Sequence, residues 1–128
     1  MRYVYVHWKH DIPEEPSHLW YEVADDSFQN RTIEFYTDGS VGFAIRGNAI
    51  DGSEDIEVGG TRNSTEGFPD LEEIIADSQF EASEVTAADF EHQWSKALEA
   101  RPRMSSHITI AIDGPAGAGK GTLARRLA

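Results

Sequence analysis

Hydrophobic and polar positions alternate along the first part of the chain, a pattern that predicts β-strands. Residues 2–9 would place two kinds of side chain on opposite faces, Val4, Val6 and Trp8 against Tyr3, Tyr5 and His7. Residues 18–24 would do the same with Leu19, Tyr21 and Val23 against His18, Trp20 and Glu22. Two prolines, Pro13 and Pro16, separate the two predicted strands.

A β-hairpin is predicted around Asp38-Gly39. A two-residue loop would pair Phe35 with Gly42, whereas a three-residue loop with a left-handed Gly39 would pair Phe35 with Val41. The second register puts every large apolar side chain of the hairpin except Tyr36 on one face. Because burial of one face specifies register strongly, we expect the three-residue loop.

Two helices are expected after a long, glycine-rich and acidic loop over residues 47–68, which has room for a short edge strand at residues 56–58. The first helix runs from Pro69 to about Asp77 and would bury Leu71, Ile74 and Ile75. A short extended piece follows over residues 81–85.

The second helix covers residues 87–100, with Thr86 as its N-cap and Asp89 three residues on. Its apolar stripe would consist of Phe90, Trp94, Ala97 and Leu98. Strands first and helices last predict an α+β domain, a small antiparallel sheet covered by two helices. The aromatic side chains of the outer sheet face would then cap a second core or form a binding face: Tyr3, Tyr5, Trp20 and Tyr36.

Charge narrows the classes of partner. The 128 residues have a net charge of −12. The sequence contains no cysteine, which excludes disulfides and thiolate sites. Residues 1–103 hold 22 acidic and 8 basic side chains, a net charge of −14. Such a domain repels nucleic acid and anionic membranes. Its acidity either only keeps the protein in solution or attracts a partner, and that partner would be a basic protein. No signal peptide or membrane-length apolar run is present, and a cytoplasmic location is expected.

Residues 1–103 offer no clear catalytic or metal site. His7 and His10 flank Trp8, but residues three apart on a strand point to opposite faces, so we expect no metal site there. The glycine-rich loop bearing Thr61 and Arg62 is expected at the surface, within reach of a partner.

This part of the chain resembles an uncharacterised bacterial family of domains of unknown function. The resemblance rests on Trp8-x-His10-Asp11, on the hairpin Phe-x-x-Asp-Gly-x-Val-Gly at residues 35–42, on Gly60-Thr61-Arg62 and on the Leu-Glu-Glu-Ile helix start. It covers about residues 2–98 and names a family without naming an activity. The function that we weigh for this part of the chain is a non-enzymatic, immunity-like domain that binds a protein.

The pattern changes at about residue 103, and residues 104–128 are expected to form a separate segment. Ile108, Ile110 and Ile112 predict a strand, and residues 114–120 match the phosphate-loop pattern G-x-x-x-x-G-K. Glycines let successive backbone N–H groups point at phosphate oxygens at a helix N-terminus. A lysine there reaches the β- and γ-phosphates, and a following hydroxyl helps to hold Mg²⁺.

The segment closely resembles the amino terminus of bacterial cytidylate kinase, on the motif Ile-Asp-Gly-Pro-Ala-Gly-x-Gly-Lys-Gly-Thr-Leu-Ala. Gly121 stands where Ser or Thr is usual, and Thr122 follows, as in nucleoside monophosphate kinases. The resemblance implies an ATP site with Mg²⁺ and phosphoryl transfer to CMP or dCMP. Its binding residues would be Gly114, Pro115, Ala116, Gly117, Ala118, Gly119, Lys120, Gly121 and Thr122.

The remaining parts of such a kinase do not follow this motif within the sequence. We therefore expect a truncated strand–loop–helix piece of a P-loop fold, the start of a fused (d)CMP kinase that is inactive as 128 residues and has no catalytic residue of its own. The alternative is that residues 1–103 are the working, protein-binding domain and that the kinase-derived tail is incidental. Whether the protein is an enzyme stays open at this point.

Overall fold

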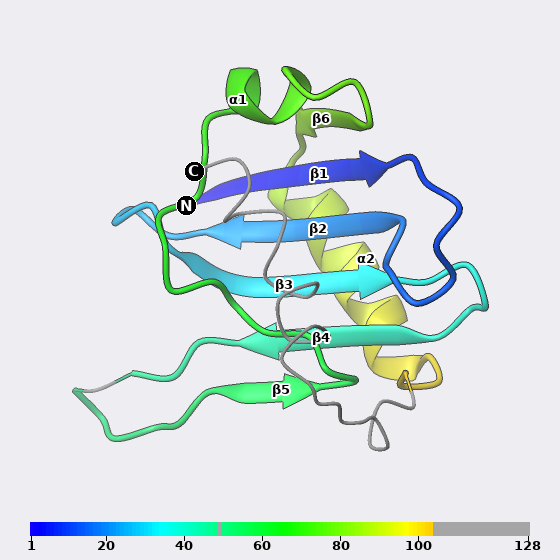
Figure 1. The fold of residues 1–128 in the computed structure, drawn as a ribbon. Helices are drawn as coiled ribbons and strands as arrows, with labels where there is room; N and C mark the ends of the chain where they lie inside the picture. The colour runs from blue at the N-terminus through cyan, green and yellow to red at the C-terminus, as the bar shows by residue number, and fades with distance from the viewer. Residues whose placement is uncertain (49, 104–128) are drawn as a thin grey trace.

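A computed structural model describes residues 1–48 and 50–103 of the chain, and these form an α+β fold (Figure 1). The six strands make one antiparallel sheet in the order β5-β4-β3-β2-β1-β6. The strands are β1 Arg2–Trp8, β2 His18–Val23, β3 Gln29–Phe35, β4 Val41–Ile45, β5 Ile56–Val58 and β6 Phe80–Glu84. The helices are α1 Leu71–Ile75 and α2 Ala87–Glu99. The α+β fold class predicted for this part of the chain is confirmed.

The β3–β4 hairpin has the three-residue loop. Phe35 pairs with Val41, and the Tyr36 and Ser40 backbones close the loop through a 3.0 Å hydrogen bond. Gly39 has a φ of +87°, the left-handed conformation that this loop requires. The choice of register by burial is therefore confirmed.

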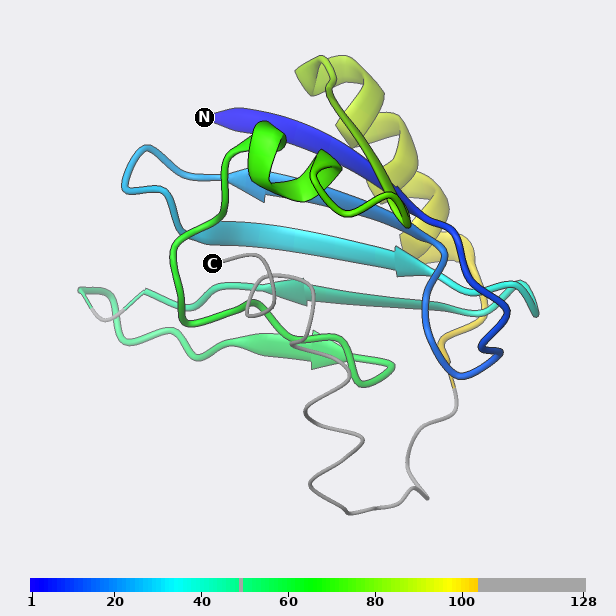
Figure 2. The same cartoon turned by 45° about the horizontal axis from the view of Figure 1, so that its top comes forward.

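The two helices lie on opposite sides of the sheet, as Figure 2 shows. The α1 face of the sheet is defined by the core that contains Ile74 of α1 and Phe68 of the preceding segment. That core is made of Val4, Val6, Trp8, Leu19, Tyr21, Val23, Phe68, Ile74 and Phe80. The alternation in β1 and β2 predicted this apolar face, which α1 and the segment before it remove from water.

The α2 face of the sheet carries a second core under the longer helix. Its buried members are Ile33, Val41, Phe90, Trp94 and Ala97. Tyr3 packs against Phe90 with ring centroids 5.4 Å apart, and Phe43 packs against Trp94 at 5.2 Å. The Thr86 hydroxyl accepts a 3.1 Å hydrogen bond from the Asp89 N–H, so the predicted N-cap is confirmed.

Three burial predictions are wrong. Ile75 is 51% exposed and Leu98 is 56% exposed, because each lies about 100° around its helix from a neighbour that faces the sheet. Tyr36 is 5% exposed and lies on the side of β3 opposite to Phe35, so it belongs to the α1 face. Tyr36 is therefore not part of an aromatic surface with Tyr3, Tyr5 and Trp20.

The chain after α2 returns to the sheet. The Val41 N–H donates to the Arg101 carbonyl at 3.0 Å, and the Arg103 N–H donates to the Val41 carbonyl at 2.7 Å. The Arg103 guanidinium lies 4.8 Å from the Tyr36 ring centroid. Residues 101–103 thus pair with the start of β4. In the described part of the chain, no helix is long and apolar enough to cross a membrane.

Candidate functional site

The predicted nucleotide-binding residues, 114–122, lie outside the described residues, as does the whole segment 104–128. The described residues contain three clusters of polar and aromatic side chains, two on the α2 face of the sheet and one buried on the α1 face.

A cavity of about 260 Å³ opens between the sheet and α2. Its lining comes from four elements: Tyr5, His18, Trp20, Phe35, Gln93 and Lys96. Tyr5, Trp20 and Phe35 reach it because strand alternation turns them to the α2 face. Gln93 and Lys96 are three residues apart, so they share one side of α2. The half-buried aromatic side chains thus form one wall, and polar helix side chains form the other.

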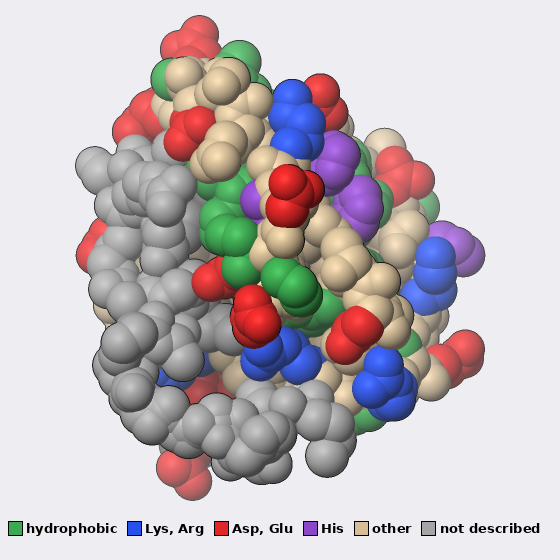
Figure 3. Space-filling view, turned by 45° about the vertical axis from the view of Figure 1, so that its right-hand side comes forward, with side chains coloured by type: hydrophobic (Ala, Val, Ile, Leu, Met, Phe, Trp, Pro, Cys, Tyr) green, Lys and Arg blue, Asp and Glu red, His purple; other side chains and the backbone are tan. Residues whose placement is uncertain are grey.

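Histidine rings extend the aromatic wall along the sheet. The His18 ring stacks on His7 with centroids 4.8 Å apart, and the Tyr5 ring lies 4.5 Å from Trp20. The Tyr5 hydroxyl and His18 Nδ1 share a hydrogen bond of 2.6 Å. Burial and the neighbouring His7 ring hold the pKa of His18 below the ordinary histidine value, which favours a neutral ring. Figure 3 shows that histidine side chains gather on one side of the molecule, beside hydrophobic ones.

The histidine pairing differs from the pair that the sequence suggested. His10 lies apart from His7, and its ring bonds the Pro16 carbonyl at 2.8 Å and the Ile12 N–H at 2.9 Å. His7 meets His18 because the two are cross-strand partners in the β1–β2 pair. That register was the signal that sequence reasoning missed. Among the described residues, no group of three or more His, Asp or Glu side chains is placed to hold a metal ion.

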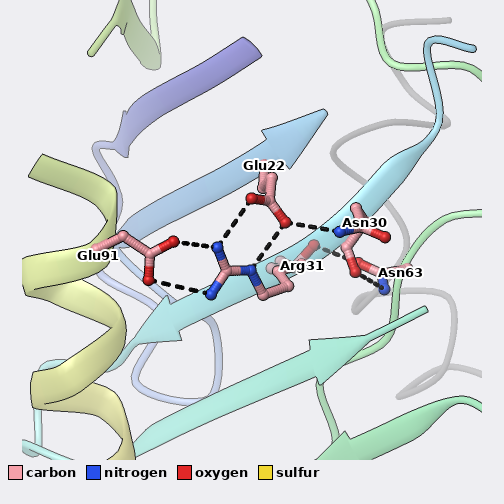
Figure 4. A network of polar contacts seen from close by, with 6 residues as sticks. Glu22, Asn30, Arg31, Asn63 and Glu91 are labelled. Atoms are coloured by element: carbon pink, nitrogen blue, oxygen red, sulfur yellow. Dashed lines mark hydrogen bonds and ion pairs between the residues drawn. The ribbon is translucent and has the colours of Figure 1, made fainter. Parts of the chain in front are cut away.

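A second cluster centres on Arg31, which lies between a strand carboxylate and a helix carboxylate (Figure 4). Arg31 donates to both oxygens of Glu22 at 2.8 Å, and Asn30 donates to the same carboxylate at 2.7 Å. Arg31 also pairs with Glu91 of α2. Its guanidinium lies 4.8 Å from the ring centroids of both Phe90 and Trp94.

The Arg31 cluster is electrostatically balanced. Burial alone would raise the pKa of Glu22, but hydrogen bonds from Arg31 and Asn30 bring that pKa below the ordinary value. The pKa of Arg31 is raised, chiefly by its hydrogen bonds to Glu22. Glu22 and Arg31 therefore keep their charges near neutral pH, and each nitrogen of the guanidinium donates to Glu22 or Glu91. This arrangement suits a structural role, in which Arg31 holds α2 against the sheet, better than a catalytic one.

A third cluster is buried on the α1 face. Glu34 is 3% exposed, and it accepts hydrogen bonds from the Thr61 hydroxyl at 2.6 Å and the Tyr36 hydroxyl at 3.2 Å. Thr61 is fully buried, so the expectation that it faces a partner is wrong. Arg62 is exposed, and its Nε lies 3.5 Å from Oε1 of Glu57. The Thr61–Glu34 hydrogen bond holds the glycine-rich loop against the sheet. Of Thr61 and Arg62, only Arg62 lies at the surface.

Comparisons with known proteins match most of the chain to a family and a short stretch of it to a kinase. Residues 2–99 match a family described as a domain of unknown function, DUF6881. Over 25 residues, 20% of this chain, the sequence is 84% identical to a cytidylate kinase of Mesorhizobium japonicum. The chain covers 12% of that kinase. No solved structure matches the chain.

Proposed function

This chain belongs to the DUF6881 family of domains of unknown function, and we propose that it joins such a domain to the ATP-binding segment of a (d)CMP kinase. The observation that supports the proposal is the 84% identity to a cytidylate kinase over 25 residues. Residues 104–128 have that length, follow the family domain and contain the phosphate-loop motif. We therefore assign the match to this segment.

The hydrogen-bond donors that the motif at residues 114–122 would present suit a nucleoside triphosphate. The glycines of residues 114–121 would let backbone N–H groups point at phosphate oxygens, Lys120 would bind the β- and γ-phosphates, and Thr122 would hold Mg²⁺. Bound ATP would supply the phosphoryl group for CMP or dCMP. Charge-assisted donors of this kind are stronger than neutral ones, so Lys120 would contribute most among the side chains.

The rest of a kinase site would have to come from elsewhere. Phosphoryl transfer also requires an acidic residue for Mg²⁺, a pocket for the monophosphate and arginines that stabilise the transferred group. Because the chain covers 12% of the matched kinase, we expect the 128-residue polypeptide to form no ADP when it is supplied with ATP and CMP.

The test is to tag the gene in its native host, and to measure the intact mass and the activity of its product. We expect a product that continues beyond Ala128 and forms ADP only when CMP or dCMP is present. Lys120→Ala should lower kcat by roughly two to three powers of ten, the loss typical of removing one preorganised transition-state donor. Arg125→Ala, which lies outside the motif, is the matched control. A product of 128 residues, or activity that survives Lys120→Ala, would overturn the proposal.

A second function has support from the described residues. We propose that the family domain also binds a basic protein, since residues 1–103 have a net charge of −14 and Tyr5 and Trp20 remain only half buried. The aromatic side chains would supply affinity, and the carboxylates would mainly speed the encounter.

Salt distinguishes those two contributions. Association should slow steeply between low and physiological salt, because charges are screened beyond about 8–10 Å. Trp20→Ala should raise the off-rate, whereas the exposed pair Glu54→Gln and Asp55→Asn should lower the on-rate. A pull-down from the native host at low salt supplies the partner for these measurements. Recovery of no basic protein, or an off-rate unchanged by Trp20→Ala, would contradict this second function.

A further inference from the structure

The cavity between the sheet and α2 differs in charge from the rest of the domain. Residues 1–103 carry 22 acidic side chains against 8 basic ones, yet none of the described residues that line the cavity has a carboxylate. Among the described lining residues, only Lys96 carries a formal charge when histidine is neutral. Neither Lys96 nor Gln93 has a side-chain hydrogen bond or ion pair with another described residue. The polar wall of the cavity therefore holds donors that are not used within the described fold.

The opposite wall offers flat apolar surface. Tyr5, Trp20 and Phe35 come from three adjacent strands and turn to the same face, with Tyr5 and Trp20 only 4.5 Å apart. The Tyr5 hydroxyl is engaged with His18, so these side chains present mainly ring surface. Aromatic rings favour offset or tilted contacts with another ring.

We propose that this cavity binds a small molecule consisting of one flat aromatic or heteroaromatic ring system with a carboxylate. The ring would lie against Tyr5, Trp20 and Phe35, and the carboxylate would accept from Lys96 and Gln93. A volume of about 260 Å³ is at the small end of ligand sites, so it suits a ligand of one or two fused rings. The proposal concerns the cavity alone, and it does not depend on the kinase segment or on a protein partner.

Two probes with the same ring and opposite charge test the ligand chemistry. Indole-3-acetate and tryptamine would each be titrated into the 128-residue chain, with the side-chain amide of Gln93 and the indole N–H of Trp20 followed by NMR. We expect both signals to shift with indole-3-acetate, with a dissociation constant on the order of 1 mM. Tryptamine should bind more weakly. Equal or tighter binding of tryptamine, or no shift of either signal at about 10 mM indole-3-acetate, would overturn the proposal.

Matched charge variants then test the role of Lys96. Lys96→Gln should weaken indole-3-acetate binding about threefold and leave tryptamine binding unchanged or tighter, since an exposed ion pair contributes modestly. Lys9→Gln makes the same change in net charge at a lysine that pairs with Glu81 outside the cavity, and it should have little effect. If Lys9→Gln weakens binding as much as Lys96→Gln does, the effect belongs to the overall charge, and the assigned site is wrong. Trp20→Leu should weaken both probes, and unchanged binding would also contradict the proposal.

Discussion

Glu34 shows how one buried carboxylate fixes a loop to the sheet. Its side chain receives hydroxyl donors from Thr61 and Tyr36, and Thr61 brings the glycine-rich loop to the α1 face. Gly42 makes this approach possible, because a Cβ at that position would lie 2.1 Å from the Thr61 hydroxyl oxygen. The glycine and the threonine are therefore parts of the same arrangement.

Thr61→Val should destabilise the domain. The variant keeps the shape of the side chain but removes a hydrogen-bond donor to a buried carboxyl group, a loss of about 1–3 kcal/mol in the free energy of unfolding. Urea denaturation of the two proteins measures it. Thr65→Val, at an exposed position of the same loop, is the control and should change stability by less than about 0.5 kcal/mol. Equal stability of the Thr61 variant and the native chain would show that the Thr61–Glu34 bond does not stabilise the fold.

His18 should titrate below the unperturbed histidine pKa of about 6.5. Burial and His7 both disfavour its charged form, so the folded state takes up this proton at lower pH than the unfolded state does. The associated stability is complete above about pH 6.5 and is lost as pH falls below that value. NMR titration of the His18 ring measures the pKa, and His7→Gln should move it upward. A pKa of His18 at or above 6.5 in the native chain would contradict the assigned cause.

At the scale of secondary-structure elements, Arg31 of β3 connects the sheet to α2 through its ion pairs with Glu22 and Glu91. Arg31→Met should destabilise the fold by about 3 kcal/mol, because it leaves the carboxylate of Glu22, which is 4% exposed, without its cationic partner. The double variant Arg31→Met with Glu22→Leu should recover much of the loss, since replacing both partners removes the unpaired charge. Chemical denaturation of the single and double variants gives both values. A double variant no more stable than Arg31→Met would mean that the contacts of Arg31 with Phe90 and Trp94 are what matter.

Sequence patterns predicted most elements because the chain alternates strongly where strands form. The β3–β4 register followed from burial, since only one pairing puts Phe35, Val41 and their neighbours on one face. Ile75 and Leu98 were predicted wrongly because apolar character alone does not say which of two adjacent helical residues faces the sheet. In each helix the neighbour, Ile74 or Ala97, takes that position.

The candidate site required three-dimensional information. The cavity is lined from β1, β2, β3 and α2, so it exists only once the strand order and the path of α2 are known. Tyr5 and Trp20 were identified from the sequence as aromatic side chains of the outer face, and the structure brings them together at 4.5 Å. The sequence could not predict that Gln93 and Lys96 line the cavity. Polar residues on a helix surface have the same pattern whether they border a cavity or only face water.

At the scale of the whole molecule, the described fold includes residues 101–103, which follow Ala100, the C-cap of α2. Arg101 and Arg103 form backbone hydrogen bonds on either side of Pro102, both to Val41. The Arg103 side chain also donates to the Glu14 carbonyl at 3.2 Å. A strand residue that is bonded in this way resists the local opening that a protease needs. The stable unit therefore extends past the end of α2 and includes residues 101–103.

Limited proteolysis should confirm that extent of the stable unit. Trypsin does not cut between Arg101 and Pro102, and we expect its first cut near the described end of the chain to follow Arg103, leaving a fragment of residues 1–103. The amide of Arg103 should exchange slowly with deuterium, because it donates to the Val41 carbonyl at 2.7 Å. Proteinase K, which does not require arginine, controls for sequence preference and should also spare residues 101–103. If proteinase K cuts at residues 100–102 as fast as it cuts after 103, the pairing with Val41 does not hold these residues, and the stable unit ends with α2.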